Sequence, residues 1–144
     1  MITSRRRPRV VLVALTPEAR EAIGEVAVVA APLPYRVGRE SRRGRRFGRI
    51  FATEHRSSTT PRTNDLYLPE FSDPLNVSRE HFLIEEDGDG FALVDRGSTC
   101  GTLVEGRQVG GRGAGGTVPL EDGDVIIVGT AFSPFIFKVR LELD

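Results

Sequence analysis

Residue types that mark particular protein classes are scarce in this sequence. Its 144 residues include one cysteine and no tryptophan. One cysteine excludes an internal disulfide, and a lone thiol suits a reducing compartment, so we expect a cytoplasmic protein. No apolar run approaches the roughly 20 residues that span a bilayer, so we expect no membrane partner. The apolar run 10–15 is also too short for a signal peptide, because Pro17 and Glu18 follow it closely.

Metal-ligating residue types are equally few. The single cysteine is accompanied by two histidines, at positions 55 and 81. These three residues show none of the paired spacings by which metal sites are recognised in a sequence. We therefore expect no metal ion and no cofactor.

The net charge of zero hides an uneven distribution of charge. Residues 1–62 contain 14 arginines and five glutamates, whereas residues 63–144 contain six basic and 15 acidic residues. A single body built from both parts has a basic and an acidic region on its surface. Because the acidic part would repel the phosphates of a nucleic acid, we expect no nucleic-acid partner.

Apolar residues recur in short runs separated by turn residues, which is typical of an all-β fold. The runs at 9–15, 25–31, 124–129 and 135–143 predict strands. Apolar and charged residues alternate in the last run, as in a strand with one buried and one wet face. Strands at this spacing, with glycine-rich turns between them, predict a β-sandwich.

Turn and cap residues predict two local elements. The Asp-Gly-Asp-Gly stretch at 87–90 separates two apolar runs and predicts a β-hairpin, because glycine accepts a positive φ at no steric cost. Between the first two strands, Thr16 is a possible helix N-cap, Pro17 suits the first helical position and Gly24 is a possible stop. One or two helical turns are expected there.

Two segments interrupt this pattern. Residues 41–64 form a long basic insert rich in Ser, Thr, Pro and Gly, which predicts a loop that includes a short hairpin at 45–54. Residues 110–116, GGRGAGG, superficially resemble a phosphate-binding loop. They lack the Gly-Lys-Ser/Thr ending and run into Thr117 rather than a helix, so we interpret them as a flexible inter-strand loop.

Cys100 raises the question of catalysis. A nucleophilic cysteine needs a base within hydrogen-bond reach, and His55 and His81 are the candidates, with Asp95 to orient either one. The alternative is an inert loop cysteine beside a structural His81. We favour this alternative, and expect neither catalytic residues nor enzymatic activity.

Three short motifs place groups suited to an anion where strands should meet loops. Arg39 supplies a guanidinium, and Ser78 and Arg79 supply a hydroxyl and a second guanidinium. Ser98 and Thr99 add hydroxyls and backbone N–H groups in a glycine-flanked turn. Arginine matches phosphate geometry with two parallel hydrogen bonds, and hydroxyls and amides complete the partners of the oxygens. Together these motifs predict a site for a phosphate monoester.

The order of the motifs resembles that of forkhead-associated (FHA) domains over residues 10–143. The matching elements are Gly-Arg at 38–39, Ser-x-x-His at 78–81, Gly-Ser-Thr-x-Gly-Thr at 97–102, Val-Glu-Gly at 104–106 and PLEDGDVIIVG at 119–129. The resemblance implies a two-sheet sandwich of about eleven strands that binds phosphothreonine peptides through loops at one end. Residues 1–9 would then be a basic tail and 41–64 an insert in the domain.

The resemblance also implies roles for individual residues. The implied binding set is Arg39, Ser78, Arg79, Ser98, Thr99 and Cys100. The implied supporting set is Gly38, His81 and Gly101. Arg39 and Ser78 would contact the phosphate, Arg79 would flank it, and Thr99 would face the peptide. The expected partner is a threonine-phosphorylated protein or peptide.

Cys100 departs from the family, which usually has Asn at this position. An amide both donates to and accepts from a peptide backbone, whereas a thiol does either weakly. The loss should weaken binding by about 1 to 3 kcal/mol. The alternative to phosphopeptide binding is therefore an interaction domain that keeps the fold but binds without phosphate.

The basic insert is the second departure. From residue 36 to residue 49 there are seven arginines in fourteen residues, which begin just before Arg39. One hypothesis is that they favour acidic or multiply phosphorylated partners, and the alternative is that the insert is a solvated loop without a role. Thr60, which precedes Pro61, is a candidate phosphorylation site for phosphorylation-dependent self-association.

Overall fold

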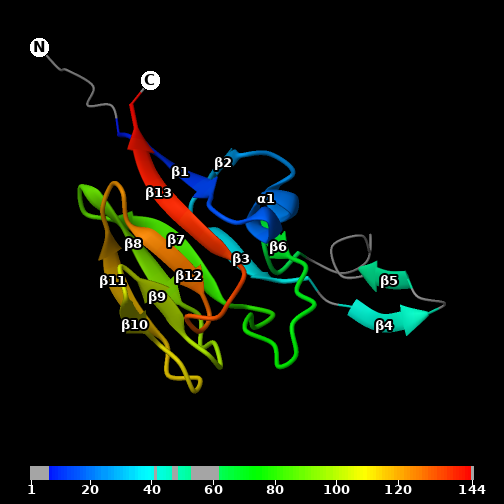
Figure 1. Ribbon diagram of the computed structural model, residues 1–144. Coiled ribbons are helices and arrows are strands. Elements are labelled where there is room, and N and C mark those ends of the chain that lie inside the picture. Colours follow the sequence, from blue (N-terminus) through cyan, green and yellow to red (C-terminus); the bar gives the residue numbers. More distant parts are fainter. Residues whose placement is uncertain (1–6, 41, 47–48, 53–61, 144) are drawn as a thin grey trace, which may run out of the picture.

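Two β-sheets pack face to face around a hydrophobic core (Figure 1). The computed structural model describes residues 7–40, 42–46, 49–52 and 62–143. Over these residues the chain forms one six-stranded, one five-stranded and one two-stranded sheet, together with one helix. The two larger sheets hold eleven strands between them, which confirms the prediction of an all-β sandwich of about eleven strands.

The six-stranded sheet has the strand order β10-β9-β12-β13-β1-β2. Its members are β1 (Arg9–Ala14), β2 (Ala27–Val29), β9 (Thr102–Val104), β10 (Arg107–Val109), β12 (Val125–Val128) and β13 (Ile136–Glu142). The five-stranded sheet has the order β11-β8-β7-β3-β6. Its members are β3 (Tyr35–Arg39), β6 (Leu66–Leu68), β7 (Phe82–Asp87), β8 (Gly90–Asp95) and β11 (Gly116–Leu120). The pair β3 and β6 is parallel, and the other pairs of this sheet are antiparallel.

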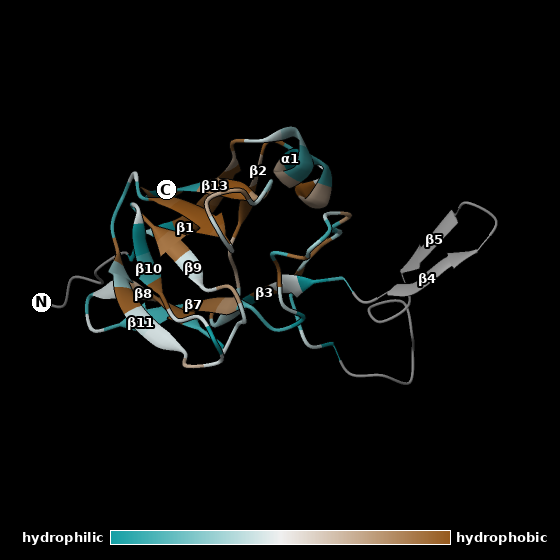
Figure 2. Ribbon diagram, turned by 60° about the horizontal axis from the view of Figure 1, so that its bottom comes forward, coloured by the Kyte–Doolittle hydropathy of each residue, from teal (hydrophilic) through white to brown (hydrophobic). Residues whose placement is uncertain are grey.

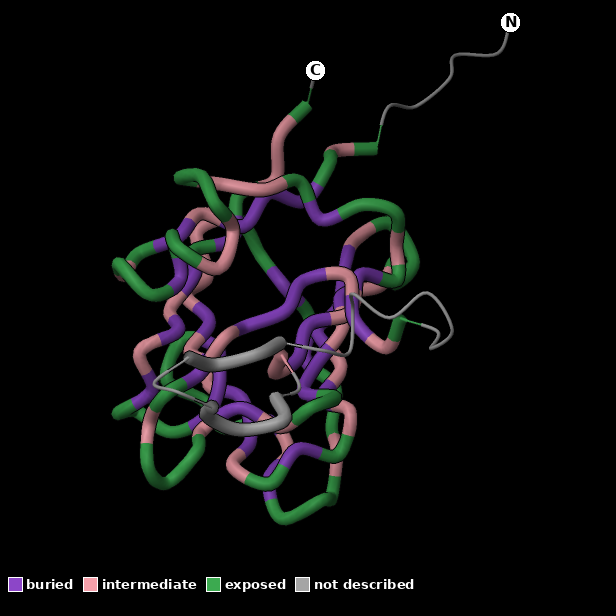
Figure 3. Tube along the Cα trace, turned by 90° about the vertical axis from the view of Figure 1, so that its right-hand side faces the viewer, coloured by how far each residue is buried: buried purple, intermediate pink, exposed green. Residues whose placement is uncertain are grey.

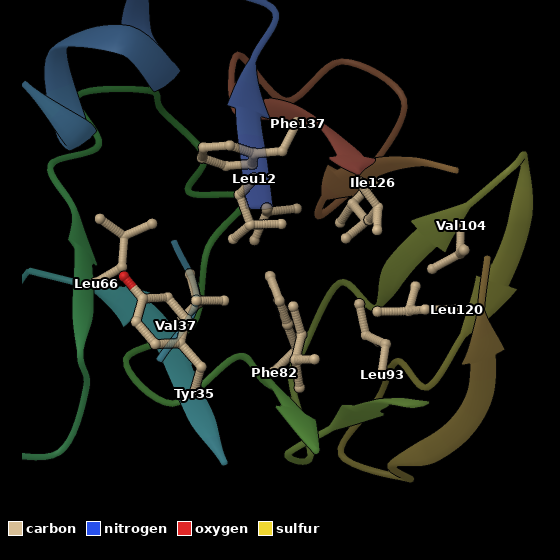
Figure 4. Packing of buried hydrophobic residues seen from close by; sticks show 14 of the residues in the cluster. Leu12, Tyr35, Val37, Leu66, Phe82, Leu93, Val104, Leu120, Ile126 and Phe137 are labelled. Carbon is tan, nitrogen blue, oxygen red and sulfur yellow. The ribbon is translucent and has the colours of Figure 1, made fainter. Parts of the chain in front are cut away.

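The alternation in the last strand decides which of its side chains enter the core. In β13, Phe137 and Val139 are buried, whereas Lys138 and Arg140 are exposed. Figure 4 shows Phe137 above Phe82 of the opposite sheet. Removing one such apolar side chain from water contributes about 1.5–3 kcal/mol. Figure 2 shows the same division, with hydrophobic residues on β1 and β13 and hydrophilic residues in many of the loops.

The expected helical turns are present as α1 (Pro17–Ile23). The hydroxyl of Thr16 accepts the N–H of Ala19 at 3.2 Å and so caps the first turn. Gly24 ends the helix with a φ of 84°, a left-handed conformation that favours glycine. Ala19 is fully buried and anchors the helix to the sandwich. The cap and stop residues thus determine both ends of α1.

Both predicted hairpins form. Strands β7 and β8 pair from Phe82 with Asp95 to Asp87 with Gly90, so the Asp-Gly turn closes the hairpin. In the basic insert, β4 (Arg42–Arg46) pairs with β5 (Arg49–Ala52) in a sheet of its own. The rest of the insert up to residue 61, including His55 and Thr60, lies outside the described residues.

Buried stretches run through the sandwich, whereas the loops at its ends are largely exposed (Figure 3). Among the described residues, no helix is long and apolar enough to cross a bilayer. The strands that matter for the site are β3, β7, β8 and β9, because the three motifs predicted to bind a phosphate lie at the end of β3, just before β7 and between β8 and β9.

Candidate functional site

Three segments that are distant in the sequence meet at one end of the sandwich. The N–H of Arg39, at the end of β3, donates to the carbonyl of Ser78 at 2.9 Å. The hydroxyl of Ser78 in turn accepts the N–H of Thr99, beyond β8, at 3.0 Å. Ser78 thus joins both other motifs, and the structure brings together the three segments that the sequence singled out.

The guanidinium of Arg39 is held in place by the neighbouring loop. Its Nε donates to the carbonyl of Val77 at 2.9 Å. Val77 itself is buried, so the carbonyl that holds the guanidinium belongs to a fixed part of the chain. A charged side chain oriented in this way loses little conformational entropy when an anion binds. Arg79, two residues further along, is exposed.

His81 links the loop that carries Ser78 to the Gly-Ser-Thr turn. Its imidazole is fully buried; Nδ1 accepts the N–H of Ser78 at 2.9 Å, and Nε2 lies 2.8 Å from the carbonyl of Gly101. A backbone N–H can only donate and a carbonyl only accept, so the ring is neutral with its proton on Nε2. Burial lowers the pKa of His81, although the bond to Gly101 acts in the opposite direction. Both ring nitrogens are occupied, so the imidazole cannot serve Cys100 as a base in this geometry.

Asp95 organises the Gly-Ser-Thr turn. Its Oδ1 accepts the N–H groups of Gly97 and Ser98 at 3.0 and 2.8 Å. Its Oδ2 accepts the hydroxyls of Ser98 and Thr102 at 2.7 and 2.9 Å. An aspartate that bonds the backbone two and three residues ahead builds a turn directly. Asp95 therefore shapes the loop and does not orient a catalytic histidine.

Ser98 faces the interior of its own loop. Its side chain is fully buried, and its hydroxyl donates to Asp95 and accepts the N–H of Gly101 at 2.9 Å. A hydroxyl that faces inward and already has both partners cannot be offered to a phosphate. We assign Ser98 to the support of the loop. Thr99 beside it is exposed.

The glycine-rich segment 110–116 also supports the turn. The N–H of Arg112 donates to the carbonyl of Thr99 at 2.8 Å, and the N–H of Gly113 donates to that of Ser98 at 3.0 Å. Gly110 lies against Asp95 so closely that a Cβ atom would overlap the carboxylate. The segment is an inter-strand loop as expected, but its function as a backing for residues 98 and 99 was not visible in the sequence.

Gly38 and Asn64 hold the backbone at Arg79. A Cβ atom at Gly38 would overlap the carbonyl oxygen of Arg79, so β3 can approach this loop only with glycine. The same carbonyl accepts the side-chain amide of Asn64 at 2.8 Å. Asn64 is fully buried although it lies at the end of the polar insert, where sequence reasoning gave it no role.

Arg96 is a second residue that sequence reasoning missed. It donates to the side-chain oxygen of Asn64 at 2.6 Å and to the carbonyl of Thr63 at 3.0 Å. Glu80 forms an ion pair with it at 3.4 Å. Burial lowers the pKa of Arg96, and the nearby carboxylate of Glu80 opposes this shift. Arg96 thus joins the end of β8 to the segment that precedes β6 and to the segment that precedes β7.

Cys100 lines a shallow groove beside these loops. The groove has a volume of about 480 Å³ and is bordered by Leu75, Asn76, Thr130 and Phe132, among others. The thiol lies 3.7 Å from the carbonyl of Leu75, a weak contact. A second hollow of about 580 Å³ lies beside α1, and none of the three motifs lines it.

The arrangement is suited to binding an anion. Arg39, Ser78 and Thr99 lie together, and Arg79 is exposed beside them. Within the described part of the chain, no group of histidine, cysteine and carboxylate side chains could hold a metal ion. The chemistry that these residues offer is recognition by charge and hydrogen bonding.

A family model described as the FHA domain matches residues 35–129 of the chain. This range contains all the residues of the three motifs. A comparison with curated protein sequences gives no match.

Solved structures share the fold at low sequence identity. An FHA domain of an Arabidopsis thaliana hypothetical protein is 24% identical with a TM-score of 0.62, and the match covers 100% of this chain and 96% of that one. EmbR of Mycobacterium tuberculosis, in complex with a low affinity phosphopeptide, is 19% identical with a TM-score of 0.60. The chain spans only 27% of EmbR. A structure from work on phosphothreonine-dependent FHA domain interactions is 22% identical with a TM-score of 0.56, covering 94% of this chain and 99% of that one.

Proposed function

The chain belongs to the FHA domain family, and from this premise we propose that it is a phosphothreonine-binding module that mediates phosphorylation-dependent association between proteins. One observation carries the proposal. The guanidinium of Arg39 is fixed by the carbonyl of Val77, the residue next to Ser78, and hydrogen bonds join Arg39 to Ser78 and Ser78 to Thr99. A preorganised guanidinium beside a hydroxyl is the combination that phosphate recognition requires.

The proposed roles follow from position. Arg39 and the hydroxyl of Ser78 bind the phosphate, Arg79 flanks it, and Thr99 faces the peptide beside it. His81 holds the two loops together through Ser78 and the carbonyl of Gly101. The similar structures support a phosphorylated ligand, since EmbR is bound to a phosphopeptide and another structure concerns phosphothreonine-dependent interactions.

Phosphate-independent binding is the second candidate function. Cys100 favours it, because a thiol replaces the amide that usually binds the peptide backbone. The exposed apolar surface beside Cys100 also favours it, since Leu75 and Phe132 are 44% and 91% exposed. A module of this kind would bind an unphosphorylated partner through the groove.

A titration with a phosphothreonine peptide library separates the two functions. We expect the protein to bind phosphorylated peptides and Arg39→Ala to lose that binding. Arg140→Ala is the matched control, because Arg140 is an exposed arginine that pairs with Glu142 on β13. If the affinity is the same with and without the phosphate, and the same in Arg39→Ala as in the wild type, the first proposal is rejected in favour of the second.

A further inference from the structure

The carboxylate of Glu70 holds together the two ends of the loop between β6 and Ser78. Glu70 is only 5% exposed. Its Oε1 accepts the N–H groups of Asn76 and Val77, each at 2.8 Å. Its Oε2 accepts the backbone N–H of Asn76 as well, at 2.8 Å, and the side-chain amide of Asn76 at 3.0 Å. Among the described residues no basic side chain forms an ion pair with Glu70. The charge is therefore stabilised by N–H groups of this loop.

Val77 connects this carboxylate to the proposed phosphate ligand. Its N–H is bound by Glu70, and its carbonyl accepts Nε of Arg39 at 2.9 Å. The next residue, Ser78, has its own N–H bound by His81. The backbone at residues 77 and 78 is thus held from both sides, and Glu70 determines where the carbonyl that orients Arg39 lies.

Asn76 extends the contact to another loop. While its Nδ2 donates to Glu70, its Oδ1 accepts the hydroxyl of Thr130 at 2.7 Å. Gly129 lies so close to the backbone of Asn76 that a Cβ atom there would overlap it. The amide of Asn76 therefore has a defined orientation, with its nitrogen toward Glu70 and its oxygen toward Thr130.

We infer that Glu70 and Asn76 are positioning residues of the phosphopeptide site. They act on the phosphate through Val77 and Arg39 and touch no ligand themselves. A buried carboxylate without a cation costs desolvation energy, and an apolar residue often stabilises a fold as well or better. What the carboxylate supplies here is a set of acceptors at the base of the loop that holds Arg39. The predicted effect of Glu70 and Asn76 on phosphopeptide binding rests on the proposed function.

The orientation of the two side chains provides a sharp test. In Asn76→Asp, a second carboxylate faces Oε2 of Glu70 where an amide donor used to lie. Glu70→Gln instead places an amide against the amide of Asn76. In the double variant Glu70→Gln/Asn76→Asp, the amide at position 70 donates to the carboxylate at position 76, which still accepts the hydroxyl of Thr130. The hydrogen bond between the two side chains is then restored in the opposite direction, the bonds to Oε1 at position 70 are kept, and the charge moves from residue 70 to residue 76.

Two readouts are needed, and both are made where urea titrations show all four proteins to be fully folded. The first is the Kd for a degenerate phosphothreonine peptide library, in which only the phosphothreonine is fixed. The second is the NMR signal of the Arg39 Nε–H in the ligand-free protein and its exchange with water. This signal reports the bond to Val77 directly, and a role of Glu70 in stability alone would leave it unchanged.

We expect Asn76→Asp to weaken binding about tenfold and Glu70→Gln to weaken it less, because Asn76 can rotate its amide. The Arg39 Nε–H should exchange faster in Asn76→Asp, and the double variant should recover both the affinity and the slow exchange. Wild-type affinity and exchange in Asn76→Asp, or a double variant no better than Asn76→Asp, would overturn the inference. If the wild type binds no phosphothreonine peptide, the proposed function fails, and the exchange of Arg39 Nε–H still decides on Glu70 and Asn76.

Discussion

The imidazole of His81 accepts the N–H of Ser78 at 2.9 Å, and this bond exists only while the ring is neutral. A protonated ring would place an N–H against the N–H of Ser78. The same ring reaches the carbonyl of Gly101 on the opposite side, so one uncharged side chain joins the two loops that carry Ser78 and Thr99. The integrity of the site is thereby coupled to the protonation of a buried group.

Acidification should therefore lower the free energy of unfolding. Burial lowers the pKa of His81 in the folded protein, whereas the unfolded chain titrates near the ordinary value of about 6.5. Below that value the unfolded state binds a proton that the folded state resists, so the stabilisation present above pH 6.5 is lost as the pH falls toward the lowered pKa. Urea unfolding measured between about pH 7.5 and 5.5 checks this expectation, because most carboxylates stay ionised in that range.

His55 provides the control for the pH experiment, since it is the only other histidine. His55→Gln should keep the pH dependence of the wild type, and His81→Gln should lose most of it while also losing stability at pH 7.5. A pH dependence that persists in His81→Gln would show that another group is responsible.

Gly38→Ala should destabilise the protein by about 1–3 kcal/mol. The added methyl group would overlap the carbonyl of Arg79 and approach Oδ1 of Asn64, and neither group can move without disturbing the bond from Nδ2 of Asn64 to that carbonyl. Gly90→Ala is the matched control, because Gly90 is also a strand glycine and its nearest neighbour is 3.9 Å away. Urea unfolding of the two variants gives the comparison, and equal stabilities would contradict the packing argument.

The local elements were predictable because their causes lie in adjacent residues. The alternation of β13, the Asp-Gly turn of β7 and β8 and the caps of α1 each depend on a few consecutive side chains. The motif residues Arg39, Ser78 and Thr99 were predictable for a different reason, which is their resemblance to a family. Neither source of information reveals which distant groups satisfy a buried polar atom.

Glu70, Asn64 and Arg96 illustrate what the sequence concealed. Each is a polar residue in a polar stretch, and polar residues are usually exposed. Glu70 and Asn64 are buried and Arg96 is half-buried, and the partners that hold them are between 6 and 33 residues away in the chain. The partners of Ser98 were hidden for the same reason, because its hydroxyl is used by Asp95 and Gly101 inside the loop.

The groove beside Cys100 should favour peptides with an apolar side chain close to the phosphothreonine. Phe132 is 91% exposed and borders the groove together with Leu75. Phe132→Ala removes apolar surface and should reduce the preference for such peptides about fivefold, as a loss of about 1 kcal/mol implies. Phe71→Ala is the control, because Phe71 is also exposed, at 57%, but is not among the residues that border the groove. An unchanged library profile in Phe132→Ala would exclude the groove as a contact.

The basic insert should add a salt-dependent component to binding. Strand β4 begins three residues after Arg39, and five arginines occupy positions 42, 43, 45, 46 and 49. Replacing these five by glutamine should weaken binding of acidic peptides and flatten the dependence of Kd on salt, because exposed charges act over about 10 Å at 0.1 M salt. If affinity and salt dependence stay the same, the insert has no part in ligand binding.

Cys100→Asn should tighten phosphopeptide binding by up to about tenfold, because an amide can donate to and accept from the peptide backbone whereas the thiol does neither well. Among the described residues, the one hydrogen-bond contact of the thiol is the weak one with the carbonyl of Leu75, so little is lost by its removal. Cys100→Ala tests that part of the argument and should bind as the wild type does. Calorimetric titration with one phosphothreonine peptide compares the three proteins.

If Cys100→Asn binds the peptide more tightly and the binding still depends on Arg39, the phosphate contacts are intact and the contact to the peptide backbone is the part this chain has lost. No gain would mean that the bound peptide runs past Thr99 along another path. On that path Cys100 would contact the peptide from the groove and would make no hydrogen bond to the peptide backbone.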